Sequence, residues 1–135
     1  TFCRILKYFY QVATIKRFYD LDCWKKSREL NFVIYKFTLQ DAFKKDFALV
    51  NQIRRCSISI MANIAEGFGR KGNKEFIHFL SIAEGSLVEL QSHLYIALDI
   101  EYLEKDDFDL AFNLSEDTQR LIYGFSEYLK KTEMN

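Results

Sequence analysis

Two apolar seams at helical spacing dominate the middle of the chain. The first recurs at steps of four and three residues and comprises Leu49, Ile53, Cys56, Ile60, Asn63 and Gly67. The second recurs in the same way and comprises Phe76, Leu80, Ala83, Leu87, Leu90, Leu94 and Ala97. A mean step of about 3.5 residues places each set along one side of an α-helix, as in bundles that pack knobs into holes. Residues 51–90 therefore predict two helices that pack as a hairpin.

Two further seams flank this hairpin. One comprises Cys23, Ser27, Leu30, Ile34 and Phe37, and the other comprises Phe108, Ala111, Ser115, Thr118, Ile122, Phe125 and Leu129. Proline is absent, so only the glycines at 67, 69 and 72 are expected to break the helical pattern. We expect helices over residues 20–38, 46–68, 73–101 and 106–130, with a loop at 40–45. Four helices with short loops predict an all-α, up-down-up-down antiparallel four-helix bundle.

Several single residues bear on this architecture. We expect Asp20, Asn73 and either Asp106 or Asp107 to cap helix N-termini. Asn63 lies on a seam and would need a buried hydrogen-bond partner. Gly85 interrupts a helix, where glycine costs about 1 kcal/mol against alanine, so it is expected to permit a close helix contact.

The chain of 135 residues is long enough for one domain, and we expect the bundle to occupy residues 18–131. Residues 1–17 fit the helical pattern poorly, and we interpret them as an extension outside the bundle. Because the first Met is Met61, upstream sequence read in frame is one origin for this segment. A secretory signal is disfavoured, since Lys7 interrupts the apolar run and no small-residue cleavage site follows.

The cysteine content bears on the cellular compartment, and the charge bears on the class of binding partner. The three cysteines have no CxxC spacing, so we expect a reduced, cytoplasmic protein, and no apolar run reaches the roughly 20 residues that span a membrane. Net charge is zero, but residues 1–19 hold only basic charges, which leaves the rest of the chain acidic on balance. A general polyanion binder is therefore not expected, and any nucleic-acid contact must be a local patch. Aromatic residues make up 16% of the chain, which favours self-association through a second apolar surface.

Two motifs match known sites only in part. Residues 67–72 spell G-x-G-x-x-G, but a dinucleotide site needs that loop after a strand, and no strand is expected here. Glu75-x-x-His78 resembles half of a di-iron site, which needs a second such motif and two further glutamates. His93 lies about four turns from His78 on the same predicted helix, too far to share a metal. Neither a nucleotide, a metal nor another cofactor is predicted.

No catalytic constellation is evident either. No cysteine lies near a histidine in the sequence, and G-x-S-x-G is absent. Glu66, Glu84 and Glu89 fall on the facing helices and could form an acid/base pair. The simpler interpretation pairs such carboxylates with Arg54 and Arg55 across the hairpin, where buried ion pairs fix helix register. We therefore expect a structural polar network of Arg54, Arg55, Asn63, Glu66, Gly85 and Glu89, and no enzyme.

A basic group lies at the turn between these two helices. Arg70, Lys71 and Lys74 flank a glycine loop and a helix N-terminus, a combination that favours anions. A solvated loop is the alternative interpretation, given the acidic remainder of the chain.

In these residues the chain resembles the four-helix-bundle S23 family, whose genes lie in intervening sequences of bacterial 23S ribosomal RNA genes. The resemblance covers about residues 18–129 and rests on four segments: the aromatic, Leu and Trp pattern of Phe18–Trp24, Gln52–Arg55, Asn63–Gly67, and Ala83–Ser86 leading to Glu89. The family commonly shows Pro in the first loop and Ala at the position of Cys56, and neither departure threatens the fold.

The resemblance implies a left-handed bundle that assembles into a homopentameric ring, without known enzymatic activity and with a suspected role in binding ribosomal or other structured nucleic acid. A related branch comprises accessory proteins of diversity-generating retroelements, which form basic pentamers that bind nucleic acid and a reverse transcriptase. The near-neutral charge of this chain departs from that branch.

The sequence leaves three hypotheses for the function. The first is an oligomer that binds structured RNA through Arg70, Lys71 and Lys74. The second is a protein-binding adaptor such as a reverse-transcriptase accessory protein, and the third is a metal-dependent bundle enzyme. No small-molecule substrate is predicted.

Overall fold

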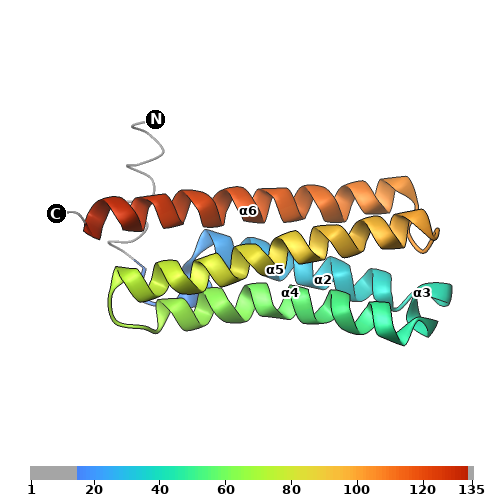
Figure 1. Cartoon of the computed structure of the whole chain (residues 1–135), viewed down its shortest axis with the longest axis horizontal. Coiled ribbons are helices and arrows are strands. Elements are labelled where there is room, and N and C mark those ends of the chain that lie inside the picture. Colours follow the sequence, from blue (N-terminus) through green and yellow to red (C-terminus); the bar gives the residue numbers. More distant parts are fainter. Residues whose placement is uncertain (1–14, 134–135) are drawn as a thin grey trace.

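Four long helices lie side by side in the computed structural model, which describes residues 15–133 (Figure 1). They are α2 (Asp22–Thr38), α4 (Phe47–Phe68), α5 (Asn73–Asp99) and α6 (Lys105–Glu133), with a 3₁₀ turn η1 (Phe18–Asp20) and a short helix α3 (Asp41–Lys45). The chain reverses between successive long helices, and α4 and α6 each pack against both α2 and α5. The predicted all-α antiparallel four-helix bundle is confirmed.

The predicted seams form the core. Every residue of the seams predicted for α2, α5 and α6 is buried. The polar members are satisfied within their own helices: the Ser27, Ser115 and Thr118 hydroxyls donate to backbone carbonyls three or four residues earlier. Buried hydroxyls paired in this way avoid the penalty of an unsatisfied polar group.

The seam of α4 differs from the prediction at one position. Ile64 is fully buried, whereas Asn63 is only partly buried and lies beside the seam. The Asn63 amide donates to the backbone oxygen of Ser59 at 2.8 Å and to the Ser59 hydroxyl at 3.0 Å. The predicted burial of Asn63 in the core is therefore wrong, because a step of four residues from Ile60 keeps an apolar side chain in the core.

Helix ends differ from the predictions at four places. Asp20 belongs to η1, and Leu21 stands at the N-cap of α2 without a side-chain bond. The expected loop at 40–45 contains α3, whose Phe43 is buried. Asp106 and Asp107 lie inside the first turn of α6, where carboxylates still favour the helix dipole.

The fourth difference concerns the start of α5. Gly72 stands at its N-cap with a φ of 97°, which side-chain-bearing residues rarely adopt. The Asn73 amide instead donates to the Leu129 backbone oxygen at 3.2 Å and to the Thr132 hydroxyl at 2.8 Å. The predicted cap is wrong, because this amide joins the start of α5 to the end of α6.

Residues 1–14 and 134–135 lie outside the described residues, so the prediction for the segment 1–17 falls mostly outside them. Of its described part, Ile15 is partly buried and packs against the core. The Phe18 ring stands edge-on to Trp24 at a centroid distance of 5.2 Å, and Leu21 is 2% exposed. The bundle therefore includes the chain from Ile15 onward. Within residues 15–133, none of the helices combines the length and apolar character needed to cross a membrane.

Two glycines on the α4–α5 hairpin have opposite surroundings. A Cβ atom on Gly67 would lie 2.8 Å from Cβ of Phe79 and 2.9 Å from the ring of Phe76. A Cβ atom on Gly85 would meet nothing within 4 Å. The close helix contact expected at Gly85 is thus located at Gly67, where α5 approaches the backbone of α4.

We predict opposite effects of alanine at these two glycines. Gly85→Ala should raise the free energy of unfolding by about 0.5–1 kcal/mol, because alanine is the better helix former at an open position. Gly67→Ala should lower it by about 1–3 kcal/mol, because Phe79 Cβ cannot move without moving α5. Urea denaturation of both variants checks this, and equal stabilisation by the two substitutions would contradict the close approach.

Candidate functional site

The loop between α4 and α5 lies at one end of the bundle (Figure 1), and it contains Arg70 and Lys71, with Lys74 in the first turn of α5. The Arg70 guanidinium bonds to the Glu66 carboxylate at 2.8 Å and lies 5.1 Å from the centroid of the Phe79 ring. Lys71 and Lys74 are exposed, and neither forms an ion pair with a described residue. The loop and the first turn of α5 therefore offer two ammonium groups that form no ion pair with a described residue, beside one anchored guanidinium.

The two ends of the bundle differ in charge. The end with the 69–72 loop also carries the C-terminal turns of α6, where Lys130 and Lys131 lie, and the start of the described chain, with Lys16 and Arg17. The opposite end carries the 100–104 turn between α5 and α6. That turn and its flanks contain one basic residue, Lys105, and a run of acidic ones: Asp99, Glu101, Glu104, Asp106, Asp107 and Asp109. Lys44 and Lys45 of α3 also lie at this end, and Glu66 and Glu75 lie at the loop end. The two ends therefore differ in their balance of charge, and the loop end is the more favourable one for a polyanion.

The polar network predicted for Arg54 and Arg55 is not formed. Arg54 Nε donates to the Thr38 hydroxyl at 2.9 Å, and its guanidinium lies 4.4 Å from the centroid of the Tyr35 ring. Arg54 therefore joins α4 to α2, away from α5. Arg55 is exposed and forms no ion pair with any described residue. Both assignments across the hairpin are corrected, because α2 and α5 flank opposite sides of α4.

The glutamates of the hairpin are likewise not brought together. Glu66 binds Arg70 within the same segment, whereas Glu89 faces Cys56 and His93. Glu84 faces α6 near Lys130 and Glu127, and its burial raises the pKa of its carboxyl above the usual value. The predicted acid/base pair of carboxylates is therefore not assembled.

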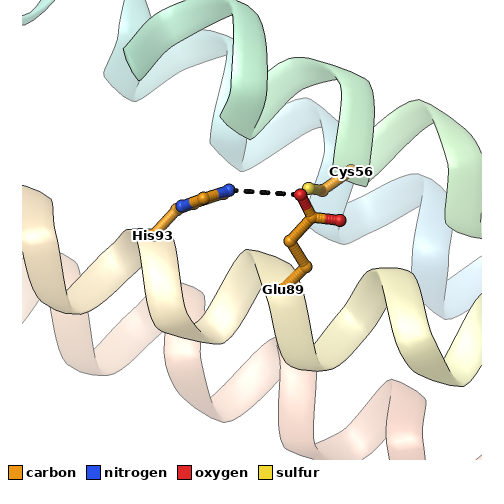
Figure 2. Close-up of side chains that lie close together, drawn as sticks. All are labelled: Cys56, Glu89 and His93. Atoms are coloured by element: carbon orange, nitrogen blue, oxygen red, sulfur yellow. Dashed lines mark ion pairs between the residues drawn. The ribbon is translucent and has the colours of Figure 1, made fainter.

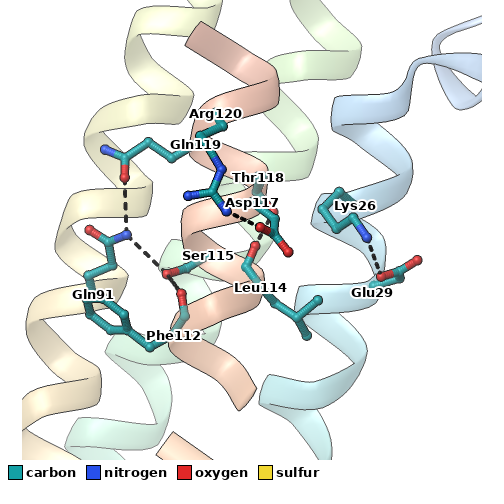
Figure 3. A network of polar contacts seen from close by, with 10 residues as sticks. All are labelled: Lys26, Glu29, Gln91, Phe112, Leu114, Ser115, Asp117, Thr118, Gln119 and Arg120. Atoms are coloured by element: carbon teal, nitrogen blue, oxygen red, sulfur yellow. Dashed lines mark hydrogen bonds and ion pairs between the residues drawn. The ribbon is translucent and has the colours of Figure 1, made fainter. Parts of the chain in front are cut away.

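Neutral hydrogen bonds connect α5 to its neighbours instead. The Ser59 and Ser86 hydroxyls lie 2.8 Å apart across the α4–α5 contact. On the other side of α5, the Gln91 amide donates to the Ser115 hydroxyl at 3.1 Å and to the Gln119 side-chain oxygen at 3.3 Å on α6 (Figure 3). Short uncharged side chains thus hold the register on both sides of α5.

Three ligand-type side chains meet at the outer edge of the α4–α5 contact (Figure 2). Cys56 comes from α4, and Glu89 and His93 come from adjacent turns of α5. One donor atom from each lies within 4.8 Å of the others, and His93 Nε2 is 3.5 Å from Glu89 Oε1. Burial raises the pKa of the Cys56 thiol to about 12, with Glu89 adding to the rise and Arg55 opposing it. A nucleophilic cysteine needs a lowered pKa, so the cluster is unsuited to a Cys–His attack on its own.

Sequence reasoning missed this cluster because its members lie on two helices. The sequence alone carries no signal that joins them, and the register of the hairpin supplies the missing information. Starting from the Ser59–Ser86 contact, three residues back along α4 and three forward along α5 give Cys56 and Glu89. In an antiparallel hairpin such steps keep residues opposite each other, and His93 follows one turn beyond Glu89.

An apolar groove runs between α2 and α6, with a volume of about 660 Å³. Its apolar lining comprises Phe32, Val33, Leu110 and Leu114, and its charged rim comprises Lys25, Arg28 and Glu29. Phe32 is 63% exposed and Leu110 is 49% exposed. Phe32 and Leu110 therefore expose apolar surface at the same groove, which is the kind of surface that a partner could cover.

The fold defines an all-α helical-bundle protein. The chain belongs to the 23S rRNA-intervening sequence protein family, whose sequence model matches residues 19–124. A solved structure of a protein with unknown function from the S23 ribosomal protein family of Bacteroides thetaiotaomicron is similar, with 28% identity and a TM-score of 0.71. The similarity covers 78% of this chain and 98% of that one. No curated protein matches the chain. The predicted family is thus confirmed.

The two neighbouring arginines give a matched test of the observed contacts. We predict that Arg54→Ala lowers the free energy of unfolding by about 1–2 kcal/mol, because it removes a partly buried hydrogen bond and a cation–π contact. Arg55→Ala should change it by less than about 0.5 kcal/mol, because the side chain is exposed. Chemical denaturation measures both changes. A larger loss of unfolding free energy for Arg55→Ala than for Arg54→Ala would contradict these contacts and support ion pairs across the hairpin.

Proposed function

We propose that this protein is a non-enzymatic, cytoplasmic homo-oligomer that binds structured RNA, with ribosomal RNA as the first candidate. The carrying observation is the uneven charge of the bundle: uncommitted Lys71 and Lys74 stand at one end, and an acidic turn stands at the other. Family membership supports ribosomal RNA as the RNA to test, since the family is described by its 23S rRNA intervening sequence. The free, buried thiols of Cys23 and Cys56 suit a reducing compartment.

The loop end is suited to phosphate in two ways. Lys71 and Lys74 supply point charges on flexible stems, which match phosphates without demanding one geometry. No side chain caps the α5 N-terminus, because Gly72 stands at the cap position, so the first backbone N–H groups of α5 are left without a side-chain partner beside the same loop. Arg70 is held by Glu66 and Phe79, and we assign it the smaller share of the contact.

Salt dependence distinguishes phosphate contact from other binding. We predict that Lys71→Ala/Lys74→Ala weakens binding to a structured 23S ribosomal RNA fragment by about tenfold or more at 0.1 M salt. The slope of log K against log salt should become shallower by about 1.5, because two phosphate contacts are lost. Fluorescence anisotropy with a labelled fragment across a salt series measures both quantities.

Lys44 and Lys45 supply the matched control. They are an exposed lysine pair on α3, at the acidic end of the bundle. Lys44→Ala/Lys45→Ala should leave affinity and slope close to those of the unmodified protein. Equal losses in the two double variants, or no binding by the unmodified protein, would refute the proposed contact at the loop.

We propose further that the groove between α2 and α6 binds a second copy of this chain, within an oligomer that is a pentamer. Its apolar floor is exposed, and its rim carries both charge signs in Lys25, Arg28 and Glu29. In a five-membered ring each surface meets a different part of the next identical subunit, and a rim of mixed sign can pair with such a surface. The groove thus supports self-association over capture of a strongly charged ligand.

Light scattering after gel filtration tests the assembly. We predict a mass near five times the 16.1 kDa of one chain. Phe32→Glu should reduce that mass, because a carboxylate would be buried unpaired in the interface. Tyr123→Glu changes a comparably exposed aromatic residue outside the groove and should leave the mass unchanged. If Phe32→Glu leaves the mass of the oligomer unchanged, the groove is not part of the subunit interface.

The adaptor hypothesis keeps one specific observation in its favour, the same apolar groove. Should a reverse transcriptase be encoded beside this gene, the groove serves it if Phe32→Glu abolishes binding to that enzyme and leaves the oligomer intact.

A further inference from the structure

The cluster of Cys56, Glu89 and His93 is not used by the proposed function and carries its own chemistry. Cys56 is 4% exposed, the His93 side chain is 20% exposed and that of Glu89 is 54% exposed. The three side chains point toward one another from α4 and α5 (Figure 2). The cluster is therefore buried on its sulfur side and open to solvent on its carboxylate side.

His93 lacks the partners that a buried imidazole needs. Both of its ring nitrogens are shielded from solvent and have no hydrogen-bond partner among the described residues. The 3.5 Å contact of Nε2 with Glu89 Oε1 is an ion pair only when the ring is protonated. Buried polar atoms without partners call for a bound water or ion.

The donor set selects the class of ion. Thiolate and imidazole are poor ligands for Mg²⁺ and Ca²⁺, which prefer oxygen. Cysteine sulfur, histidine nitrogen and carboxylate oxygen are the three ligand types of protein zinc sites. We propose that Cys56, Glu89 and His93 bind one Zn²⁺ per chain, with the fourth coordination position open to solvent.

The spacing of the donor atoms is close to that of a formed site. Bond lengths of about 2.0–2.3 Å in a tetrahedron place ligand atoms about 3.5 Å apart. The His93–Glu89 pair already has this spacing, and all three donors lie within 4.8 Å of one another. Glu89 is close to both partners, so a tetrahedral site needs the Cys56 and His93 side chains to move toward each other by about 1 Å. A thiolate, a carboxylate and a neutral imidazole also balance the charge of the ion.

The ion would join the two helices that carry the RNA-contact loop. Cys56 belongs to α4 and the other two ligands to α5, so zinc would add an interhelical link one turn from the Ser59–Ser86 contact. Three protein ligands with an open position leave room for a water molecule. This inference stands independently of RNA binding and fails or succeeds on metal binding alone.

Zinc binding is tested on the full chain, reduced and freed of metal with a chelator that is then removed. Calorimetric titration with Zn²⁺ should give one site per chain, and a large excess of Mg²⁺ should not compete. Saturating Zn²⁺ should raise Tm by about 5 °C or more, because it binds the folded state. With Co²⁺ as the probe, thiolate-to-metal charge-transfer absorption should appear together with the visible bands of a tetrahedral site.

Matched variants assign the ligands. Glu89→Gln and His93→Gln should each weaken Zn²⁺ binding by about tenfold or more, since losing even an outer partner of a ligand costs that much. Cys56→Ala should abolish the charge-transfer band. His78→Gln removes the other histidine of α5 and should change nothing. A Cys3→Ser/Cys23→Ala variant leaves Cys56 as the only cysteine and should retain both zinc and the band.

Three results would overturn the proposal. They are no stoichiometric Zn²⁺ uptake, uptake that survives both Glu89→Gln and His93→Gln, and loss of the band in Cys3→Ser/Cys23→Ala while the variant remains folded. Should Cys56→Ala fail to fold, Glu89→Gln decides the question, because its side chain is half exposed and its shape is unchanged.

Discussion

The close approach of α4 and α5 at Gly67 is the contact on which the rest of the molecule depends. A Cβ atom on residue 67 would lie 2.8 Å from Phe79 Cβ, so α5 can come this near only to a glycine. That contact and the turn at Gly72 fix the register of α4 against α5. One register then sets Ser59 against Ser86 and Cys56 against Glu89. The positions of the loop cations and of the three-ligand cluster therefore both depend on the contact of α4 with α5 at Gly67.

Ion pairs do not join the helices of this bundle within residues 15–133, although the sequence predicted buried pairs with Arg54 and Arg55. Every ion pair among the described residues joins side chains three or four positions apart in the chain, and such exposed pairs contribute little to stability. Helices are joined by neutral hydroxyls and amides, and by Arg54 on Thr38. Most cations of the described chain, Lys71 and Lys74 among them, are exposed at the surface.

Seam periodicity was sufficient to predict the bundle and most of its core, because burial of one helix face is a property of spacing alone. It failed at Asn63, where a change of step from three to four brings Ile64 inward. It also failed for Gly85, Asn73 and Arg54, whose roles depend on which helix lies beside each one. The order of helices around the bundle decides that, and spacing along one helix does not contain it. For the same reason Cys56 and His93 could not be joined from sequence without the hairpin register.

A crystal structure of the full chain grown with Zn²⁺, with anomalous data at the zinc edge, tests this dependence most directly. We predict that Ser59 Oγ lies within hydrogen-bond distance of Ser86 Oγ, that Phe79 packs on Gly67, and that one anomalous peak is bonded to Cys56, Glu89 and His93. A displacement of α5 along α4 by one turn, about 5.4 Å, would contradict the register and with it both assignments on the hairpin.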